Sequence, residues 1–222
     1  MGVLLDREGE LEALGTLIED ASAGRGRLAL VEGEPGIGKT ALLGAAAELA
    51  ADAGALAVEA RGAELEREFG FGVVRQLLER QVAGSPESLK GAAAHSAPAL
   101  GAGEVSPTAG SDGFFAALHG LYWLVEGLAS SRPLALLVDD AHWADEESLR
   151  FLAYLAGRLE GLPTLLVLGT RSGRAVSERP VLAGLANAGS AHSLRPSALS
   201  RGAVAKAVHD ALGSEPAKEF TD

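Results

Sequence analysis

The sequence predicts an α/β fold in three layers, with a central, mainly parallel sheet of about five strands covered by helices. Two observations support this prediction. Short apolar runs alternate along the chain with longer helical stretches, which is the order expected when parallel strands are joined by helical crossovers. The runs are also continuously apolar and lack a period of two, as expected for strands that are buried on both faces.

Five apolar segments are expected to form the strands. In chain order they are Arg27–Glu32, Ala55–Ala60, Pro133–Asp139, Thr164–Thr170 and the short His192–Leu194. The third segment ends in acidic residues, and the third and fourth are apolar enough to be central strands of the sheet.

Four segments are expected to form helices between these strands. They are Thr40–Ala53, Val73–Val82, Phe114–Ser130 and Glu146–Leu159. The first is rich in Ala and Leu and stops at Gly54, while the second and third carry apolar residues at spacings of three and four. Gly84–Gly113 collects Gly, Pro, Ser and Ala without periodicity, so we expect a loop with at most one short helix there.

Length and composition exclude several classes of protein. The 222 residues are 47% hydrophobic and 22% charged, which excludes an intrinsically disordered chain. They include no Cys, so disulfides and Cys-based zinc or redox sites are excluded. The net charge of −11 disfavours nucleic-acid binding, which needs clustered basic residues. Acidic residues near the start and apolar runs of only about five residues argue against a signal peptide or a membrane span, so a cytoplasmic chain is expected.

A phosphate-binding motif joins the first strand to the first helix. Gly33-Glu-Pro-Gly-Ile-Gly-Lys-Thr40 matches G-x-x-x-x-G-K-[ST] in full, and its glycines allow backbone N–H groups to converge on an anion. Lys39 is expected to contact the β- and γ-phosphates, and the Thr40 hydroxyl to bind Mg²⁺. The alternative is an ordinary glycine-rich turn. The motif predicts a P-loop NTPase fold that binds ATP or ADP with Mg²⁺, through Gly33, Glu34, Pro35, Gly36, Ile37, Gly38, Lys39, Thr40 and Ala41.

Two carboxylates follow the third predicted strand, at the sheet edge where ligands collect in open α/β folds. We expect Asp139 to hold Mg²⁺ as a Walker B acid, and Asp140 to orient or deprotonate the attacking water. The alternative is that both residues only begin a turn. Arg171 follows the next strand and is expected to sense the γ-phosphate, unless it is a solvated loop residue.

The sequence does not decide the role of Ala141-His-Trp143, the tripeptide that follows these acids. His142 either senses nucleotide or is structural, and Trp143 is more often a packing residue than a chemical one.

Three sequence blocks resemble the STAND-class signalling ATPases. Leu5-Asp-Arg-Glu-Gly-Glu-Leu11 is similar to their L-x-G-R-E-x-E-L segment, with Asp6 where that class usually has Gly. Leu136-Leu-Val-Asp-Asp-Ala-His-Trp-Ala-Asp145 matches a block typical of the class, and Leu194-Arg-Pro-Ser-Ala-Leu-Ser200 resembles the L-R-P-x-x-L-S that opens its helical lid. From residue 3 to the end, the chain is similar to the N-terminal ATPase module of large LuxR-type transcriptional regulators related to MalT.

The resemblance implies an ATP/ADP switch. In that class, ADP holds a closed resting form, and ATP with an inducer opens a form that self-associates. By motif position, the resemblance assigns roles to Lys39 and Thr40 (phosphate and Mg²⁺), Asp139 (Walker B acid), Asp140 (water activation) and Arg171 (γ-phosphate). Arg7 and Pro196 correspond to segments that border the adenine in relatives.

We expect residues 1–195 to form the nucleotide-binding domain and residues 196–222 to begin a truncated helical lid. The sequence contains no helix-turn-helix, helical repeat or basic patch, so the DNA-binding domain is expected in a missing C-terminal part, and this chain is not expected to bind nucleic acid or membranes. The predicted function is a regulatory ATPase with slow turnover. The alternatives are a nucleotide-binding interaction module with negligible hydrolysis and a P-loop small-molecule kinase.

Overall fold

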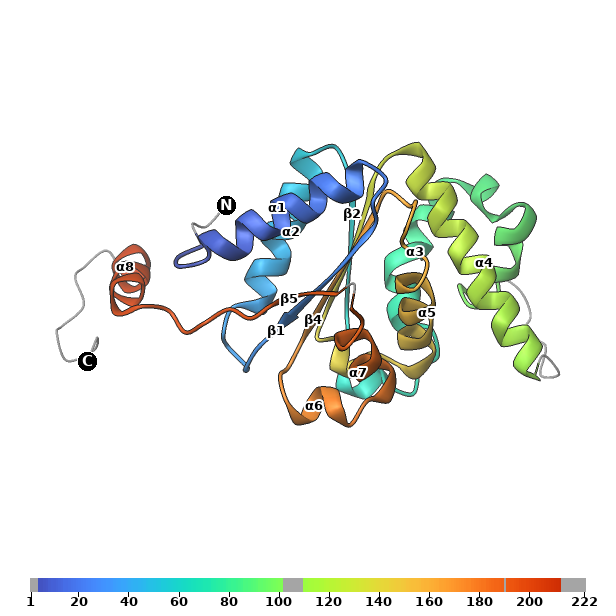
Figure 1. Cartoon of the computed structure of the whole chain (residues 1–222). Helices are drawn as coiled ribbons and strands as arrows, with labels where there is room; N and C mark the ends of the chain where they lie inside the picture. Colours follow the sequence, from blue (N-terminus) through green and yellow to red (C-terminus); the bar gives the residue numbers. More distant parts are fainter. Residues whose placement is uncertain (1–3, 102–109, 190, 213–222) are drawn as a thin grey trace.

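The predicted sheet is present in the computed structural model, which describes residues 4–101, 110–189 and 191–212 (Figure 1). Its five strands pair in parallel in the order β2-β3-β4-β1-β5. They are β1 (Arg27–Glu32), β2 (Leu56–Arg61), β3 (Leu134–Asp139), β4 (Thr164–Thr170) and β5 (Ala191–Leu194). The prediction of an α/β fold with a parallel sheet of about five strands is confirmed.

Helices connect successive strands. The α-helices are α1 (Glu8–Ser22), α2 (Lys39–Asp52), α3 (Gly72–Gly84), α4 (Gly110–Ser131), α5 (Glu146–Ala156), α6 (Arg174–Ser177), α7 (Pro180–Ala186) and α8 (Arg201–Leu212). Four short 3₁₀ helices are η1 (Glu64–Glu66), η2 (Pro86–Leu89), η3 (Gly91–Ser96) and η4 (Ala141–Trp143). Four of the α-helices correspond to the predicted ones, with ends shifted by a few residues, whereas the sequence patterns did not predict α1, α6 and α7.

The expected loop between residues 84 and 113 is more structured than predicted. It contains η2 and η3, and α4 already begins at Gly110, while residues 102–109 lie outside the described part. Packing explains η3, because Ala93 and Ser96 are buried against α4. At Gly120 of α4, a Cβ would lie 2.4 Å from the backbone nitrogen of Ser96. This contact between distant segments is not visible in a local sequence pattern.

Two hydrophobic cores cover the two faces of the sheet. Leu28 and Leu30 of β1 point to the face covered by α3, α4, α5 and α7. Ala29 and Val31 point to the opposite face, which α1 and α2 cover. Figure 1 shows these two groups of helices on either side of the strands. The continuous apolar runs in the sequence therefore reflect strands that are buried on both faces.

The chain after β5 returns to the start of α1. Arg7 donates a hydrogen bond of 2.7 Å to the Ser197 carbonyl, and the Asp6 carboxylate accepts one of 2.6 Å from the Ser200 backbone nitrogen. α8 then lies beside this segment, apart from the sheet in Figure 1. The domain boundary between residues 195 and 196 stays a prediction. In the described ranges, no helix is both long and apolar enough to cross a membrane.

The central strand β3 offers a test of the core. Leu136 is fully buried, whereas Leu65 is 99% exposed. We expect Leu136→Ala to lower the free energy of unfolding by about 2–5 kcal/mol, because it leaves a cavity in a close-packed interior. Leu65→Ala is the matched control and should change it by less than about 0.5 kcal/mol. Urea unfolding measures both values, and equal losses would contradict this assignment of the core.

Candidate functional site

The P-loop begins the site at the C-terminal edge of β1. Gly36 and Gly38 have φ angles of 81° and 101°, in the left-handed region that favours glycine. Gly38 then precedes the first residue of α2, so the N-terminal end of this helix faces the loop. The sequence motif therefore has the backbone needed to bind a phosphate.

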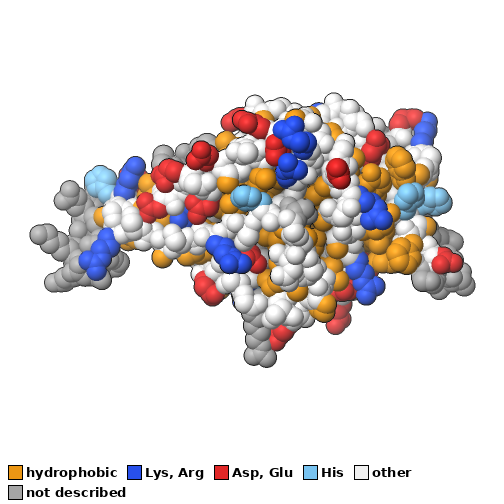
Figure 2. Space-filling view, viewed as in Figure 1, with side chains coloured by type: hydrophobic (Ala, Val, Ile, Leu, Met, Phe, Trp, Pro, Cys, Tyr) orange, Lys and Arg blue, Asp and Glu red, His pale blue; other side chains and the backbone are white. Residues whose placement is uncertain are grey.

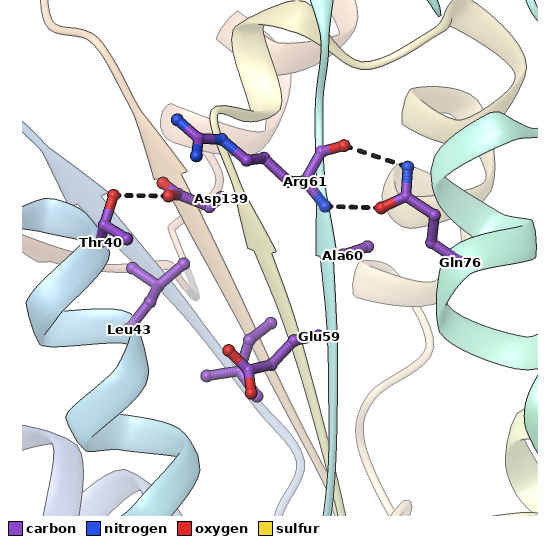
Figure 3. A pocket seen from close by; sticks show the side chains of 8 residues that line it. Thr40, Leu43, Glu59, Ala60, Arg61, Gln76 and Asp139 are labelled. Carbon is purple, nitrogen blue, oxygen red and sulfur yellow. Dashed lines mark hydrogen bonds between the residues drawn. The ribbon is translucent and has the colours of Figure 1, made fainter.

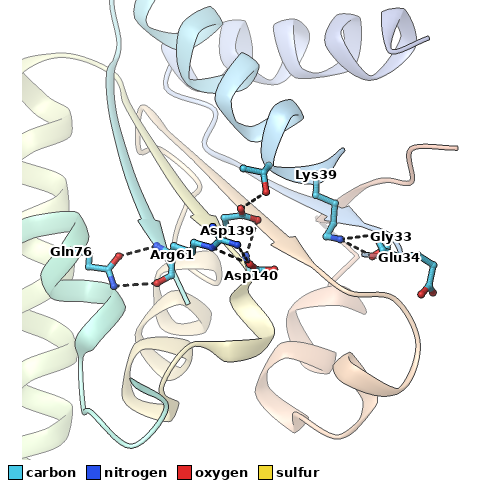
Figure 4. Close-up of polar contacts among 8 residues, drawn as sticks. Gly33, Glu34, Lys39, Arg61, Gln76, Asp139 and Asp140 are labelled. Atoms are coloured by element: carbon cyan, nitrogen blue, oxygen red, sulfur yellow. Dashed lines mark hydrogen bonds and ion pairs between the residues drawn. The ribbon is translucent and has the colours of Figure 1, made fainter. Parts of the chain in front are cut away.

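Lys39 extends its side chain back over the same loop. Its Nζ donates hydrogen bonds of 2.9 Å to the carbonyl oxygens of Gly33 and Glu34 (Figure 4). The residue is only 7% exposed. Since an ammonium group has three donors, the third can bind a phosphate oxygen without breaking either contact. Lys39 is thus fixed in position before a nucleotide binds.

Thr40 and Asp139 meet from α2 and β3. The Thr40 hydroxyl donates a hydrogen bond of 2.6 Å to Asp139 Oδ2 (Figure 3). Asp139 Oδ1 accepts one of 2.9 Å from the Asp140 backbone nitrogen. Hydroxyl and carboxylate oxygens are the ligands that Mg²⁺ prefers. Within the described residues, no cluster of three His, Asp or Glu could hold a metal alone. This pair fits a Mg²⁺ that also binds phosphate oxygens.

A cavity of about 290 Å³ lies behind this pair. Its lining includes Leu43 of α2, Glu59 and Arg61 of β2, and Leu137 of β3 (Figure 3). The site therefore has a hollow on its β2 side, between polar groups at the strand ends and an apolar floor.

Asp140 does not point freely into solvent, because Arg61 holds its carboxylate. Arg61 at the end of β2 donates from Nη2 and Nε to Asp140 Oδ2, at 2.8 and 3.1 Å (Figure 4). The ion pair with Asp140 raises the pKa of Arg61, and the charge of Asp139 adds to this effect. Gln76 of α3 fixes the Arg61 backbone through two hydrogen bonds.

Sequence reasoning did not identify Arg61. Its signal is its place in the register, opposite Asp139 at the same edge of the parallel sheet. The predicted second strand ended at Ala60, one residue too early to include it.

The turn after the acids packs tightly. Asp140 has a φ of 49°, and Gly62 lies so close that a Cβ there would be 2.4 Å from the Asp140 carbonyl oxygen. Arg179 donates hydrogen bonds of 2.9 Å to the carbonyls of His142 and Ala144.

Asp145 is another residue that sequence reasoning missed. It is buried and caps α5 by accepting a hydrogen bond of 2.8 Å from the Ser148 nitrogen, and it also accepts from the nitrogens of Phe71 and Val73. Asp145 therefore joins the start of α3 to the start of α5, directly after the turn that begins at Asp140.

Arg171 is exposed just after β4, on the same edge as the P-loop. Its guanidinium carbon lies 5.8 Å from the centre of the Trp143 ring. Trp143 in turn stacks at a tilt against His142, with ring centres 5.1 Å apart. The structure thus places Arg171 beside the turn that carries Asp140, and its contact with the γ-phosphate stays a prediction.

His142 is buried within this charged edge. Burial lowers its pKa from the ordinary value of 6.5, the nearby Asp140 charge opposes this, and the charges of Arg171 and Lys39 lower it further. In residues 4–101, 110–189 and 191–212, neither ring nitrogen has a hydrogen-bond partner. We infer a neutral imidazole at pH 7.

Arg7 and Pro196 are both buried, and Arg7 contacts the P-loop. Arg7 donates a hydrogen bond of 3.0 Å to the carbonyl of Ile37, as well as the one to Ser197. Asp6 has a φ of 55°. This is the left-handed conformation that favours Gly, and Asp is among the residues that tolerate it. The adenine contact of Arg7 and Pro196 stays a prediction.

The lowered pKa of His142 can be measured. The unfolded chain binds a proton near pH 6.5, whereas the folded chain does so only at lower pH. Stability from the neutral imidazole is therefore fully present above pH 6.5 and is lost as the pH falls toward the folded-state pKa. NMR titration of the imidazole C2 proton, assigned with His142→Gln, should give a pKa below 6.5. A value at or above 6.5 would contradict the buried, neutral assignment.

Comparison with solved structures shows the same fold in larger proteins. Cdc6p from Pyrobaculum aerophilum is 20% identical with a TM-score of 0.61, over 98% of this chain and 52% of that one. The ORC2 protein of Aeropyrum pernix, in ADPNP–ADP complexes, is 20% identical with a TM-score of 0.59, over 95% and 53%. The ORC1 protein of Aeropyrum pernix, in complex with DNA, is 19% identical with a TM-score of 0.54, over 98% and 52%. This chain spans about half the length of each.

The comparison with curated protein sequences gave no match. A family model described as "AAA ATPase domain" matches residues 3–168, a range that contains the P-loop, Arg61 and both acids at the end of β3. On this match, which covers most of the chain, the protein belongs to the AAA ATPase domain family of nucleotide-binding P-loop ATPases.

Proposed function

We propose that this chain is a regulatory switch module that binds ATP and ADP with Mg²⁺ and hydrolyses ATP slowly. The observation that carries the proposal is the 2.6 Å contact between Thr40 and Asp139 beside a preset Lys39. These two oxygens would hold Mg²⁺, which when bound neutralises charge on the β- and γ-phosphates. The P-loop residues Gly33, Glu34, Pro35, Gly36, Ile37, Gly38 and Ala41 would surround the phosphates.

The remaining site residues have separate roles in the proposal. Asp140 orients the attacking water or accepts its proton, and Arg171 binds the γ-phosphate. Arg7 and Pro196 border the adenine. The ORC2 structure similar to this chain is described in complexes with ADPNP and ADP, which supports a site that takes both triphosphate and diphosphate.

Slow turnover follows from the engagement of Asp140. Its carboxylate is held by Arg61 at 2.8 Å, and a base that is paired with a cation is less available to a water molecule. Catalysis would require this ion pair to open. The same contact also favours the second candidate, a nucleotide-binding interaction module with negligible hydrolysis. Measured phosphate release separates the two.

The switch is proposed to act in a LuxR-type transcriptional regulator. Three sequence blocks support this role, and Arg7 links the P-loop carbonyl of Ile37 to Ser197. We propose that residues 1–195 form the ATPase domain and that residues 196–222 begin the lid. The bound nucleotide would then control the conformation of the lid and the self-association of the protein. On the face in Figure 2, basic and acidic side chains are interspersed. With the net charge of −11, this supports DNA binding by another part of such a regulator.

Lys39→Ala tests nucleotide binding. Loss of the charged donor should weaken binding of both ATP and ADP by about 10- to 100-fold, because hydrogen bonds to charged groups contribute about 1.5–3 kcal/mol. The control is Lys90→Ala, which removes the same charge from an exposed site. Isothermal titration with Mg²⁺ gives the affinities. Equal affinity in wild type and Lys39→Ala would contradict the proposed site.

Two substitutions test the roles of Asp140 and Arg61 in turnover. Asp140→Asn should lower the rate of phosphate release by about 100-fold, since it removes a general base. Arg61→Ala should raise the rate, because it frees the carboxylate, while changing stability by less than about 1 kcal/mol, as expected for an exposed pair.

The double variant provides the control for this pair. Arg61→Ala added to Asp140→Asn should give no increase in phosphate release. An increase there, or an unchanged rate in Asp140→Asn, would show that Asp140 is not the base. Rapid turnover only after a small hydroxylated substrate is added would favour the kinase alternative.

A further inference from the structure

The ring of Trp143 is contacted by two arginines. The guanidinium carbon of Arg67 is 5.5 Å from the ring centre, and that of Arg171 is 5.8 Å away. Arg67 follows η1, directly after β2, and Arg171 follows β4, so three segments meet at one indole. Both arginines are exposed, whereas Trp143 is half-buried.

Among the described residues, these two cations have no acidic partner. In the described ranges, neither guanidinium forms a hydrogen bond or an ion pair, although the chain carries 30 acidic residues. Neighbouring arginines are paired: Arg61 binds Asp140 and Arg179 binds Glu146. Two like charges at one ring repel each other, and an anion that contacts both would remove that cost.

The position of the pair identifies the anion. Trp143 lies in the turn that begins with Asp140, and Gly62 packs against the backbone of this turn, so the segment leading to Arg67 starts beside it. On the other side, the Thr170 carbonyl accepts a hydrogen bond of 3.2 Å from the Gly33 nitrogen, which places the start of Arg171 beside the P-loop. The anion expected at this edge is the terminal phosphate of a nucleotide bound at the P-loop.

The neighbour of the indole supports this assignment. His142 contacts Trp143 at 5.1 Å and is neutral, since burial lowers its pKa. It braces the ring without adding a positive charge. Lys39 from the loop and the two arginines on the indole therefore lie on this edge together with Arg61, which is already paired with Asp140.

We propose that Arg67 is a second arginine that binds the γ-phosphate end of ATP, and that Trp143 is a positioning residue that holds Arg67 and Arg171 for this contact. The inference rests on the proposed function. Arginine forms forked, charge-assisted hydrogen bonds with phosphate, and ADP lacks the phosphoryl group concerned. Arg67 therefore makes the site prefer ATP to ADP.

The test compares affinities for ADP and for a non-hydrolysable ATP analogue, both with Mg²⁺, in the full chain. Arg67→Ala should weaken analogue binding by about tenfold and leave ADP binding within about twofold. Arg158→Ala is the matched control, because Arg158 also stacks on an aromatic ring, at 3.7 Å from Tyr154, but lies in the turn after the C-terminal end of α5. It should leave both affinities unchanged, and Arg67→Lys should restore only part of the loss.

Substitutions of Trp143 test its positioning role. Trp143→Leu should reduce analogue affinity in the wild-type background and have little further effect when Arg67 and Arg171 are both Ala, since the ring then has no arginine to position. Trp143→Phe should retain most of the affinity because it keeps an aromatic face. Equal urea midpoints for the two Trp143 variants verify that the comparison reports binding and not folding.

Three results would overturn the inference. If Arg67→Ala keeps the wild-type ratio of ADP and analogue affinities, Arg67 does not contact the terminal phosphate, and the proposed function still stands. If Trp143→Leu reduces analogue affinity by the same factor with and without the two arginines, the role of the indole is structural. If the wild-type chain binds neither nucleotide, the proposed function fails and this inference fails with it.

Discussion

The contact between Thr40 and Asp139 depends on the strand order of the sheet. Thr40 lies in the first turn of α2, which follows β1, and Asp139 ends β3, and another strand lies between β1 and β3. β4 separates β1 from β3, so the Asp139 side chain must pass the end of β4 to approach α2. The residue at that point is Gly169, where a Cβ would lie 3.0 Å from Asp139 Oδ1. A larger side chain would press on the carboxylate that accepts the Thr40 hydroxyl. The contact between Thr40 and Asp139 therefore depends both on the strand order and on the glycine at position 169.

Two of the charged side chains at this edge, Lys39 and Asp139, are held by uncharged groups and not by oppositely charged side chains. Lys39 donates hydrogen bonds to backbone carbonyls, and Asp139 accepts hydrogen bonds from a hydroxyl and an amide, so these contacts do not neutralise the charge of either residue. Asp140 differs, since Arg61 binds it directly. The groups proposed to hold nucleotide and metal are preset, whereas the group proposed to activate water is restrained. This combination suits a protein whose output is its bound state.

The sequence was sufficient for the parts of the fold that are set locally. Apolar runs located the five strands to within a residue or two, and the spacing of glycines with Lys39 located the P-loop. Arg61 escaped because its importance arises from parallel register, which pairs it with Asp139 across strands far apart in sequence. η3 escaped because it depends on Gly120 of a later helix. Contacts between distant segments decide both cases, and no local pattern encodes them.

At Asp6 in the N-terminal segment, an unfavourable backbone conformation is combined with a side-chain hydrogen bond. Asp6 adopts a φ of 55°, at a cost that glycine would not have, yet its carboxylate accepts a hydrogen bond of 2.6 Å from Ser200. The hydrogen bond between the Asp6 side chain and the segment before α8 thus offsets the energetic cost of the left-handed backbone. Arg7, the next residue, bonds both Ile37 and Ser197. Because Arg7 contacts both the P-loop and the chain leading to α8, a shift of the loop can be transmitted to that chain through its side chain.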